Sequence, residues 1–106
     1  MKKNIQVLNY GGEVMYIVLV YDIKLDEEGP RILRHTFKEC KKYLHHVQNS
    51  VFEGEISKSK LIEFKLKIQK IIRKDKDSVI IFKSREERWL DKEIIGYEKY
   101  PTDIFI

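Results

Sequence analysis

The residue best placed to do chemistry is Asp22, which ends the apolar run Met-Tyr-Ile-Val-Leu-Val-Tyr-Asp at positions 15–22. The unbroken apolar stretch from Tyr16 to Tyr21 predicts a central strand that is buried on both faces. Open sheets tend to place functional groups at the carboxyl ends of their central strands. Asp22 is therefore the first candidate for a functional carboxylate, although an ordinary turn carboxylate gives the same pattern.

Basic residues form the second candidate site. At the helical repeat, six of them share an arc of about 100° on the helix predicted after Pro30, namely Arg31, Arg34, Lys38, Lys41, Lys42 and His45. A stripe of one sign suits contacts with phosphates. The same stripe is also typical of an amphipathic helix whose charged side simply faces water, so both interpretations stay open.

The distribution of charge favours a polyanionic partner. The chain carries a net charge of +4, yet residues 31–45 hold five Lys/Arg against one acidic residue, and residues 57–76 hold eight against two. Together these two segments carry +10, which leaves −6 for the rest of the chain. Such segregation is typical of nucleic-acid-binding proteins, but lysine-rich helices on an ordinary surface also produce it.

Composition and length exclude several other classes. A chain of 106 residues with 42% hydrophobic and 36% charged residues predicts one soluble domain, small enough to favour an oligomer. No apolar run approaches the roughly 18 residues of a membrane span, and the N-terminus lacks a signal-peptide pattern, so we expect a cytoplasmic protein that does not bind membranes. A lone Cys40 agrees with a reducing compartment. The spacing of His35, Cys40 and His45 does not favour a zinc site.

The elements that must position these residues begin with a helix after the central strand. Proline is favoured at a first helical position, so Pro30 predicts the start of a helix over residues 31–44. Its predicted core face is Leu33, Phe37, Cys40 and Leu44, flanked by Ile32 and Thr36. Residues 46–56 then predict two strands with a crease at residues 48–50.

A second helix and a late strand complete the predicted order. Ser57 or Ser59 is expected to cap a helix that ends near Lys74. Its predicted core face is Leu61, Phe64, Ile68, Ile71 and Ile72, and Ile62 and Leu66 form a second apolar flank that would suit contact with another subunit. Residues 78–83 predict another buried strand, and residues 93–98 and 102–106 predict short extended pieces.

This order predicts an α+β fold, a ferredoxin-like βαββαβ sandwich over residues 15–106 with an additional C-terminal strand. The helices would cover one face of the sheet, so we expect a homodimer that buries the other face, with residues 103–106 joining the partner's sheet edge. Residues 1–14 form a predicted N-terminal extension. Either Met15 is the true start, or residues 5–8 form an extra edge strand.

Several of these segments resemble a known family. The strand Met-Tyr-Ile-Val-Leu-Val-Tyr-Asp-Ile at residues 15–23, the Arg-containing first helix, Val-Gln-Asn-Ser-Val-Phe-Glu-Gly at residues 47–54 and Asp-Ser-Val at residues 77–79 are similar to the smaller of the two core CRISPR spacer-acquisition proteins. The resemblance covers residues 15–106. It implies a ferredoxin-like homodimer with a divalent-metal site near the dimer axis, metal-dependent endonuclease activity, and a scaffold that bridges the larger integrase on protospacer DNA.

The resemblance also assigns expected roles. Asp22 matches the acidic residue that binds Mg²⁺ or Mn²⁺ together with its dimer mate, which makes it the expected catalytic and metal residue; two carboxylates and waters suffice for such an ion. Arg31 and Arg34 match basic positions of the first helix, and Ser50 and Phe52 match the hydroxyl and aromatic positions of the motif. His46 stands where some members carry arginine, and a mostly neutral histidine is a poorer phosphate clamp.

Two function classes follow from these expectations. The first is a DNA-binding scaffold of CRISPR adaptation that dimerises and bridges the integrase, with Lys38, Lys41 and Lys42 adding to the nucleic-acid surface. The second is a magnesium-dependent endonuclease that acts on RNA or DNA through paired Asp22 carboxylates. A stand-alone toxin-like ribonuclease of the same fold is the more distant alternative.

Overall fold

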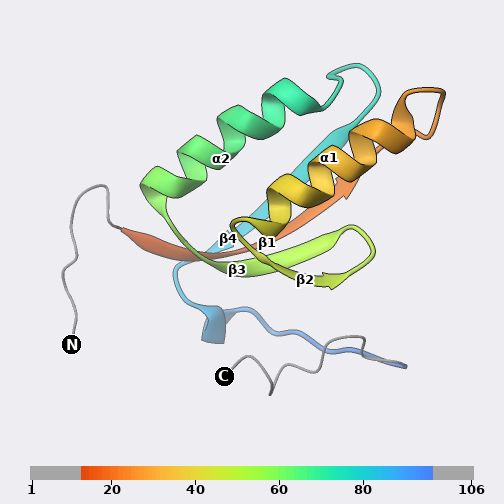
Figure 1. Ribbon diagram of the computed structural model, residues 1–106. Helices are drawn as coiled ribbons and strands as arrows, with labels where there is room; N and C mark the ends of the chain where they lie inside the picture. The colour runs from red at the N-terminus through yellow and green to blue at the C-terminus, as the bar shows by residue number, and fades with distance from the viewer. Residues whose placement is uncertain (1–12, 97–106) are drawn as a thin grey trace.

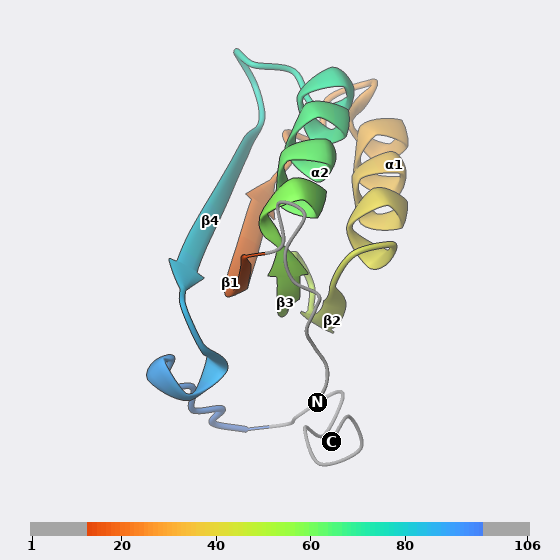
Figure 2. The ribbon, with the colours of Figure 1, turned by 90° about the vertical axis from the view of Figure 1, so that its left-hand side faces the viewer.

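The computed structural model describes residues 13–96 as one antiparallel sheet with both helices on the same face (Figure 1). The sheet order is β2-β3-β1-β4. The elements are β1 (Val14–Asp22), α1 (Gly29–Lys41), β2 (His45–Gln48), β3 (Val51–Ser57), α2 (Lys58–Ile71), β4 (Ser78–Ser84) and a short 3-10 helix, η2 (Glu87–Trp89). The predicted α+β class and βαββαβ order are therefore confirmed, and Figure 2 shows the same elements after a turn of 90°.

No helix within residues 13–96 is long and apolar enough to cross a membrane.

β1 is the central strand that the apolar run predicts. It pairs antiparallel with β3 on one side and with β4 on the other, so that Leu19 lies opposite both Phe52 and Ile81. Because side chains alternate along a strand, Ile17, Leu19 and Tyr21 point to the helices, and Tyr16, Val18, Val20 and Asp22 point to the opposite face. We call these the inner face and the outer face of the sheet.

The hydrophobic core fills the space between the inner face and the helices. The side chains of Ile17, Leu19, Phe52 and Phe64 have no exposed surface, and Ile56, Leu61 and Ile68 are also buried. The predicted core face of α2 is thus confirmed at Leu61, Phe64 and Ile68, with Ile71 and Ile72 half-buried beside them. Ser57 is the predicted cap, since its hydroxyl accepts a hydrogen bond from the backbone N–H of Lys60 at 3.2 Å.

The buried side of α1 differs from the predicted one. The most buried line is Ile32, Thr36 and Cys40, whereas Leu33 and Phe37 are only half-buried. Thr36 tolerates burial because its hydroxyl donates to the carbonyl of Ile32, one turn earlier, at 2.8 Å. The helix is therefore rotated toward Thr36, and it ends at Lys41 rather than at Leu44. This rotation leaves Leu33 and Phe37 at the rim of the core.

The late strand is less buried than its sequence predicts. β4 is an edge strand within the described chain: its Val79 and Ile81 pack against the core, but Ile80 and Phe82 are 51% and 53% exposed on the outer face. The apolar run of β1 is also only half-buried on the outer face at Val18 and Val20. In this chain, the continuous apolar runs of β1 and β4 therefore belong to strands whose outer face is not covered by the helices.

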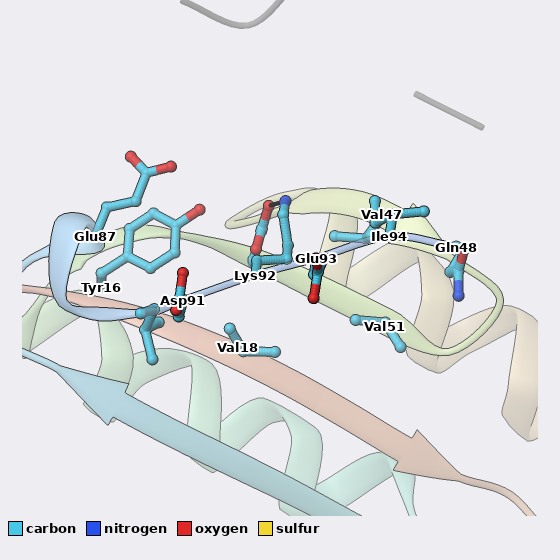
Figure 3. Close-up of a pocket in the computed structure, with 12 residues that line it drawn as sticks. Tyr16, Val18, Val47, Gln48, Val51, Glu87, Asp91, Lys92, Glu93 and Ile94 are labelled. Carbon is cyan, nitrogen blue, oxygen red and sulfur yellow. Dashed lines mark hydrogen bonds and ion pairs between the residues drawn. The ribbon is translucent and has the colours of Figure 1, made fainter. Parts of the chain in front are cut away.

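The segment after β4 covers part of the outer face. Residues 91–96 form no strand, so the described part of the extended piece predicted at residues 93–98 does not add to the sheet. This segment instead crosses beneath the sheet, where Lys92 forms an ion pair with Glu53, and it encloses a cavity against Tyr16, Val18 and Val51 (Figure 3). The predicted strands at residues 5–8 and 102–106, and the partner-edge role of residues 103–106, lie outside the described residues.

Candidate nucleic-acid interface

Asp22 lies at the carboxyl end of β1, on the outer face, and is exposed. It follows Tyr16, Val18 and Val20 in the outer row of the strand, and its Cα partner across the β1–β4 pair is Ser78. Among residues 13–96, no group of three His, Cys, Asp or Glu side chains could hold a metal ion. One chain therefore supplies a single exposed carboxylate at this position.

The five predicted basic residues, four in α1 and Lys42 at its C-cap, are all exposed, which agrees with a binding surface. Their local partners differ. Arg31 donates to Glu28 at 2.7 Å, and Lys42 forms an ion pair with Glu39 at 3.3 Å. Lys41 lies over the Phe37 ring, with its Nζ 6.0 Å from the centroid.

Arg34 and Lys38 are the two basic residues of α1 that make neither an ion pair nor a cation–π contact within the described part of the chain. They lie one turn apart and line the same cavity. Their charges are therefore the ones that a phosphate group can reach without displacing an internal partner.

The motif residues His46 and Phe52 belong to an aromatic cluster inside the fold. The His46 ring lies 4.8 Å from both Phe37 and Phe52, and Phe37 contacts Phe52 edge-on at 5.4 Å between centroids. The Nε2 atom of His46 also lies 2.8 Å from the carbonyl oxygen of Asn49. Phe52 is a core residue with no exposed surface, so it is not a surface platform for bases.

Ser50 lies in the tight turn between β2 and β3. Asn49, which precedes it, has a positive φ of 42°, a left-handed conformation that asparagine adopts more readily than most residues. The carbonyl of Ser50 accepts a hydrogen bond from the backbone N–H of Tyr21 at 3.2 Å. This bond fixes the turn against the carboxyl end of β1, next to Asp22.

A cavity of about 550 Å³ lies between α1, the end of β1 and this turn. We call it the α1 cavity; it is lined by Tyr21, Leu33, Arg34, Phe37, Lys38, Asn49 and Ser50. It exists because the rotation of α1 leaves Leu33 and Phe37 at the rim of the core. The structure thus brings Arg34, Lys38 and Ser50 together. Asp22 directly follows Tyr21 of the cavity lining, but its side chain lies on the other face of the sheet.

Much of the basic charge outside α1 has a structural role. Arg73 donates to Asp26 Oδ1 at 2.6 Å and to Asp77 Oδ2 at 2.9 Å. The backbone N–H of Lys24 donates to the same Asp77 at 2.9 Å. These four residues, which we call the Arg73 network, hold the loop after β1 against the loop before β4.

The Arg73 network also has an electrostatic signature. The hydrogen bonds from the Arg73 guanidinium are the main cause that lowers the pKa of Asp26 and of Asp77 from 3.8 to about 2 in each case. Both carboxylates are therefore ionised at neutral pH, and their negative charges neutralise the positive charge of Arg73.

The lysines of α2 are partly neutralised in the same way. Lys60 and Lys67 each lie within 4.0 Å of Glu63, and Lys67 also approaches the buried Glu39. The second basic segment therefore contributes less to a binding surface than its count of lysines indicates.

Sequence reasoning missed the residues that complete the cavity and the loop. Tyr21, Leu33 and Phe37 were assigned only to strand or core, and Arg73 was counted as part of the basic surface. The Asn-Ser pair at residues 49–50 could have indicated part of this cavity, because residues that favour a turn also place polar groups at the surface.

Comparisons with known proteins all find matches in one protein family. A family model described as "CRISPR associated protein Cas2" matches residues 15–92. A protein of Fusobacterium nucleatum subsp. nucleatum, named CRISPR-associated endoribonuclease Cas2, is 54% identical over 106 residues, which is all of both chains. A protein of the same name from Methanothermobacter thermautotrophicus is 36% identical over 92 residues, 87% of this chain and 96% of its own. A crystal structure described as cas2 superposes with a TM-score of 0.72 and 35% identity, over 83% of this chain and 93% of that chain.

Proposed function

Because the chain belongs to the Cas2 family of CRISPR-associated proteins, we propose that it acts in CRISPR adaptation as a two-fold dimer that binds nucleic acid and cleaves phosphodiester bonds at paired Asp22 carboxylates. The observation that carries the proposal is the position of Asp22 at the end of an apolar row on the outer face. A second copy stacked on this face would bring its own Asp22 toward the first. In the cell, the same dimer would bridge the larger integrase on protospacer DNA.

The exposed hydrophobic residues of the outer face support the dimer. Ile80 and Phe82 are each about half exposed, and the register places them beside Val20 and Val18 of β1. Exposed apolar side chains gathered on one sheet face are typical of an interface, and a small domain gains most from covering them. A two-fold axis through this face would place the same residues of both chains in the interface. The dimer would therefore contain a pair of Asp22 carboxylates, one from each chain.

The chemistry of this pair fits a hard divalent cation. Mg²⁺ prefers carboxylate oxygens and retains several waters, so two exposed aspartates supply a plausible ligand set, and a single chain does not. When bound, such an ion stabilises charge on a phosphate and activates water. The chain's own contributions are the Asp22 carboxylates, which would hold the ion on the outer face, and the cations Arg34 and Lys38, which would bind phosphates of the nucleic acid on the helix side of the sheet.

The direct test is Asp22→Asn, which keeps the shape of the side chain and removes its charge. Cleavage of RNA in the presence of Mg²⁺ should fall by at least about 100-fold, because the ion loses its anionic ligands. The dimer and the affinity for nucleic acid should stay unchanged. Asp75→Asn is the matched control, since Asp75 is exposed in the turn after α2 and should leave cleavage unchanged. Cleavage that persists in rigorously purified Asp22→Asn would contradict the proposal.

The binding part of the proposal is tested separately by salt. With six or more phosphate contacts per dimer, affinity for a duplex should fall by about 10³-fold between 50 and 200 mM salt. Replacing both Arg34 and Lys38 with alanine should weaken binding and flatten this dependence. Replacing the exposed Lys58 and Lys70 of α2 with alanine removes the same charge from the other helix and should change the slope less. Equal effects of the two pairs would place the interface elsewhere.

A further inference from the structure

The α1 cavity combines an apolar wall with cations at its rim, and the role proposed for Asp22 does not use it. We propose that this cavity binds one unpaired base of a single-stranded nucleic acid, while Arg34 and Lys38 bind the adjacent phosphates. The inference rests on the proposed function and adds to it the kind of strand that the site prefers. It concerns a surface on the helix side of the sheet, away from the outer face.

The size and walls of the cavity fit a base. Small-molecule sites typically measure about 300–1,000 Å³, and this cavity of about 550 Å³ lies within that range. Its hydrophobic lining comes mainly from Leu33 and Phe37, which the rotation of α1 leaves half-buried. Phe37 is held by edge-on contacts with His46 and Phe52, and Lys41 lies over its ring, so the ring is fixed in the cavity lining. A preorganised aromatic wall favours a flat, apolar ligand such as a nucleobase.

The charge of the rim selects an anion beside that base. Arg34 and Lys38 line the cavity and have no ion-pair partner among residues 13–96, whereas Arg31 and Lys42 of the same helix are paired with Glu28 and Glu39. No Asp or Glu of the described chain lines the cavity. A ligand with a flat apolar part and a neighbouring negative charge satisfies both features, and a nucleotide within a strand has both.

The polar turn on the other side supplies groups for the edge of a base. Asn49 and Ser50 line the cavity, and an amide and a hydroxyl can each donate and accept hydrogen bonds. The turn is fixed by the hydrogen bond between Tyr21 and Ser50 and by the His46 contact with the Asn49 carbonyl. A base inside a duplex is paired and stacked, and its extraction costs free energy. The cavity should therefore prefer single strands.

The first measurement uses the protein without substitutions and three probes that carry the same end label. These are a short single-stranded RNA, the same strand with abasic sites, and its duplex. The base-containing single strand should bind about tenfold or more tightly than the abasic strand, because each stacked base contributes to affinity. Equal affinity for the two strands would overturn the inference. Failure to bind any probe would instead contradict the proposed function as well.

A pair of variants then assigns the preference to the cavity. Leu33→Trp fills the cavity and should abolish the difference between the base-containing and abasic strands, while binding of the duplex is retained. Leu66→Trp is the matched control, because Leu66 is 56% exposed on α2 and does not line the cavity. It should keep the full difference. If Leu33→Trp keeps the difference, the base binds elsewhere and the inference is wrong. If circular dichroism shows that Leu33→Trp does not fold, a strand that carries the fluorescent base 2-aminopurine decides the question. The unmodified protein should quench the fluorescence of this base, and Ser50→Phe should abolish the quenching.

Discussion

The two faces of the sheet are built from alternate residues of the same strands, yet within residues 13–96 only the inner face is fully covered. Ile17, Leu19 and Phe52 have no exposed surface beneath the helices. Their neighbours on the outer face, Val18 and Val20, are half-buried, and Phe82 of β4 is 53% exposed. The inner face thus supplies the core of the described residues, and the outer face, which carries Asp22, is the face on which we propose assembly and chemistry. One strand serves both purposes because its side chains alternate.

The largest expected difference between the faces is in stability. Phe52→Ala should lower the free energy of unfolding by about 3–5 kcal/mol, because it removes a fully buried ring from the aromatic cluster. Phe82→Ala makes the same change on the outer face and should cost under about 1 kcal/mol at concentrations where the chain is monomeric. Urea denaturation of both variants measures the two values. Equal losses would mean that the outer face is also part of the core of a single chain.

The next expected difference is in self-association. Ile80→Glu places a carboxylate among apolar residues of the outer face, so the dissociation constant of the dimer should rise by at least about tenfold. Ile62→Glu is the matched control, since Ile62 is 50% exposed on α2, and its dimer should be unchanged. Sedimentation equilibrium provides the measurement. Dissociation in Ile62→Glu alone would show that the apolar flank of α2, and not the sheet, is the interface.

The smallest expected effect is on the pH dependence of stability. It tests whether the Arg73 network, which joins the loop after β1 to the loop before β4, stabilises the folded chain. The pKa of Asp26 and of Asp77 lies near 2 in the folded protein and near 3.8 when unfolded, so the unfolded state binds more protons between these values. Their contribution to stability is therefore complete above about pH 4 and is lost as the pH falls toward 2. Arg73→Gln should reduce this acid sensitivity.

Urea midpoints at pH 3 and pH 6 check that expectation. The unmodified protein should lose more stability than Arg73→Gln between these two pH values. Lys74→Gln, at the exposed neighbouring position, should behave as the unmodified protein does. If all three proteins lose the same amount of stability, the Arg73 network does not cause the acid sensitivity.

Local signals made most of the fold predictable. The central strand β1, the turn at Asn49, and the cap at Ser57 each depend on residues a few positions apart, and all three are confirmed. The predicted burial of β1 on both faces is wrong at Val18 and Val20, which are half-buried. The rotation of α1 was not predictable, because its periodicity allows Leu33 or Thr36 to face the core, and a hydrogen bond to the Ile32 carbonyl makes the latter acceptable. The exposure of β4 was also missed, since an edge strand with an exposed apolar face has the same apolar run as a buried strand.

The candidate site was predictable only in part. Asp22 and the basic residues of α1 were found from their types and spacing, and the structure places them at the surface. The charge of Arg73 was misread, because a count of basic residues does not distinguish a free cation from one bound to Asp26, 47 positions away. The α1 cavity depends on a helix, a strand end and a turn that meet only in the folded chain, so no single stretch of sequence contains it.

The Arg73 network has a further consequence for the order of folding. It joins Lys24 to Asp77 across 53 positions, and β1 gains its second partner only when β4, which ends at Ser84, has been synthesised. Contacts so distant in sequence raise the contact order and slow the search for the native topology. On the ribosome, β1 is made before β3 and β4, so it can be locked in place only after β4 has emerged. Its apolar residues therefore remain unprotected while the rest of the chain emerges, and we expect nascent chains to depend on a chaperone over that interval.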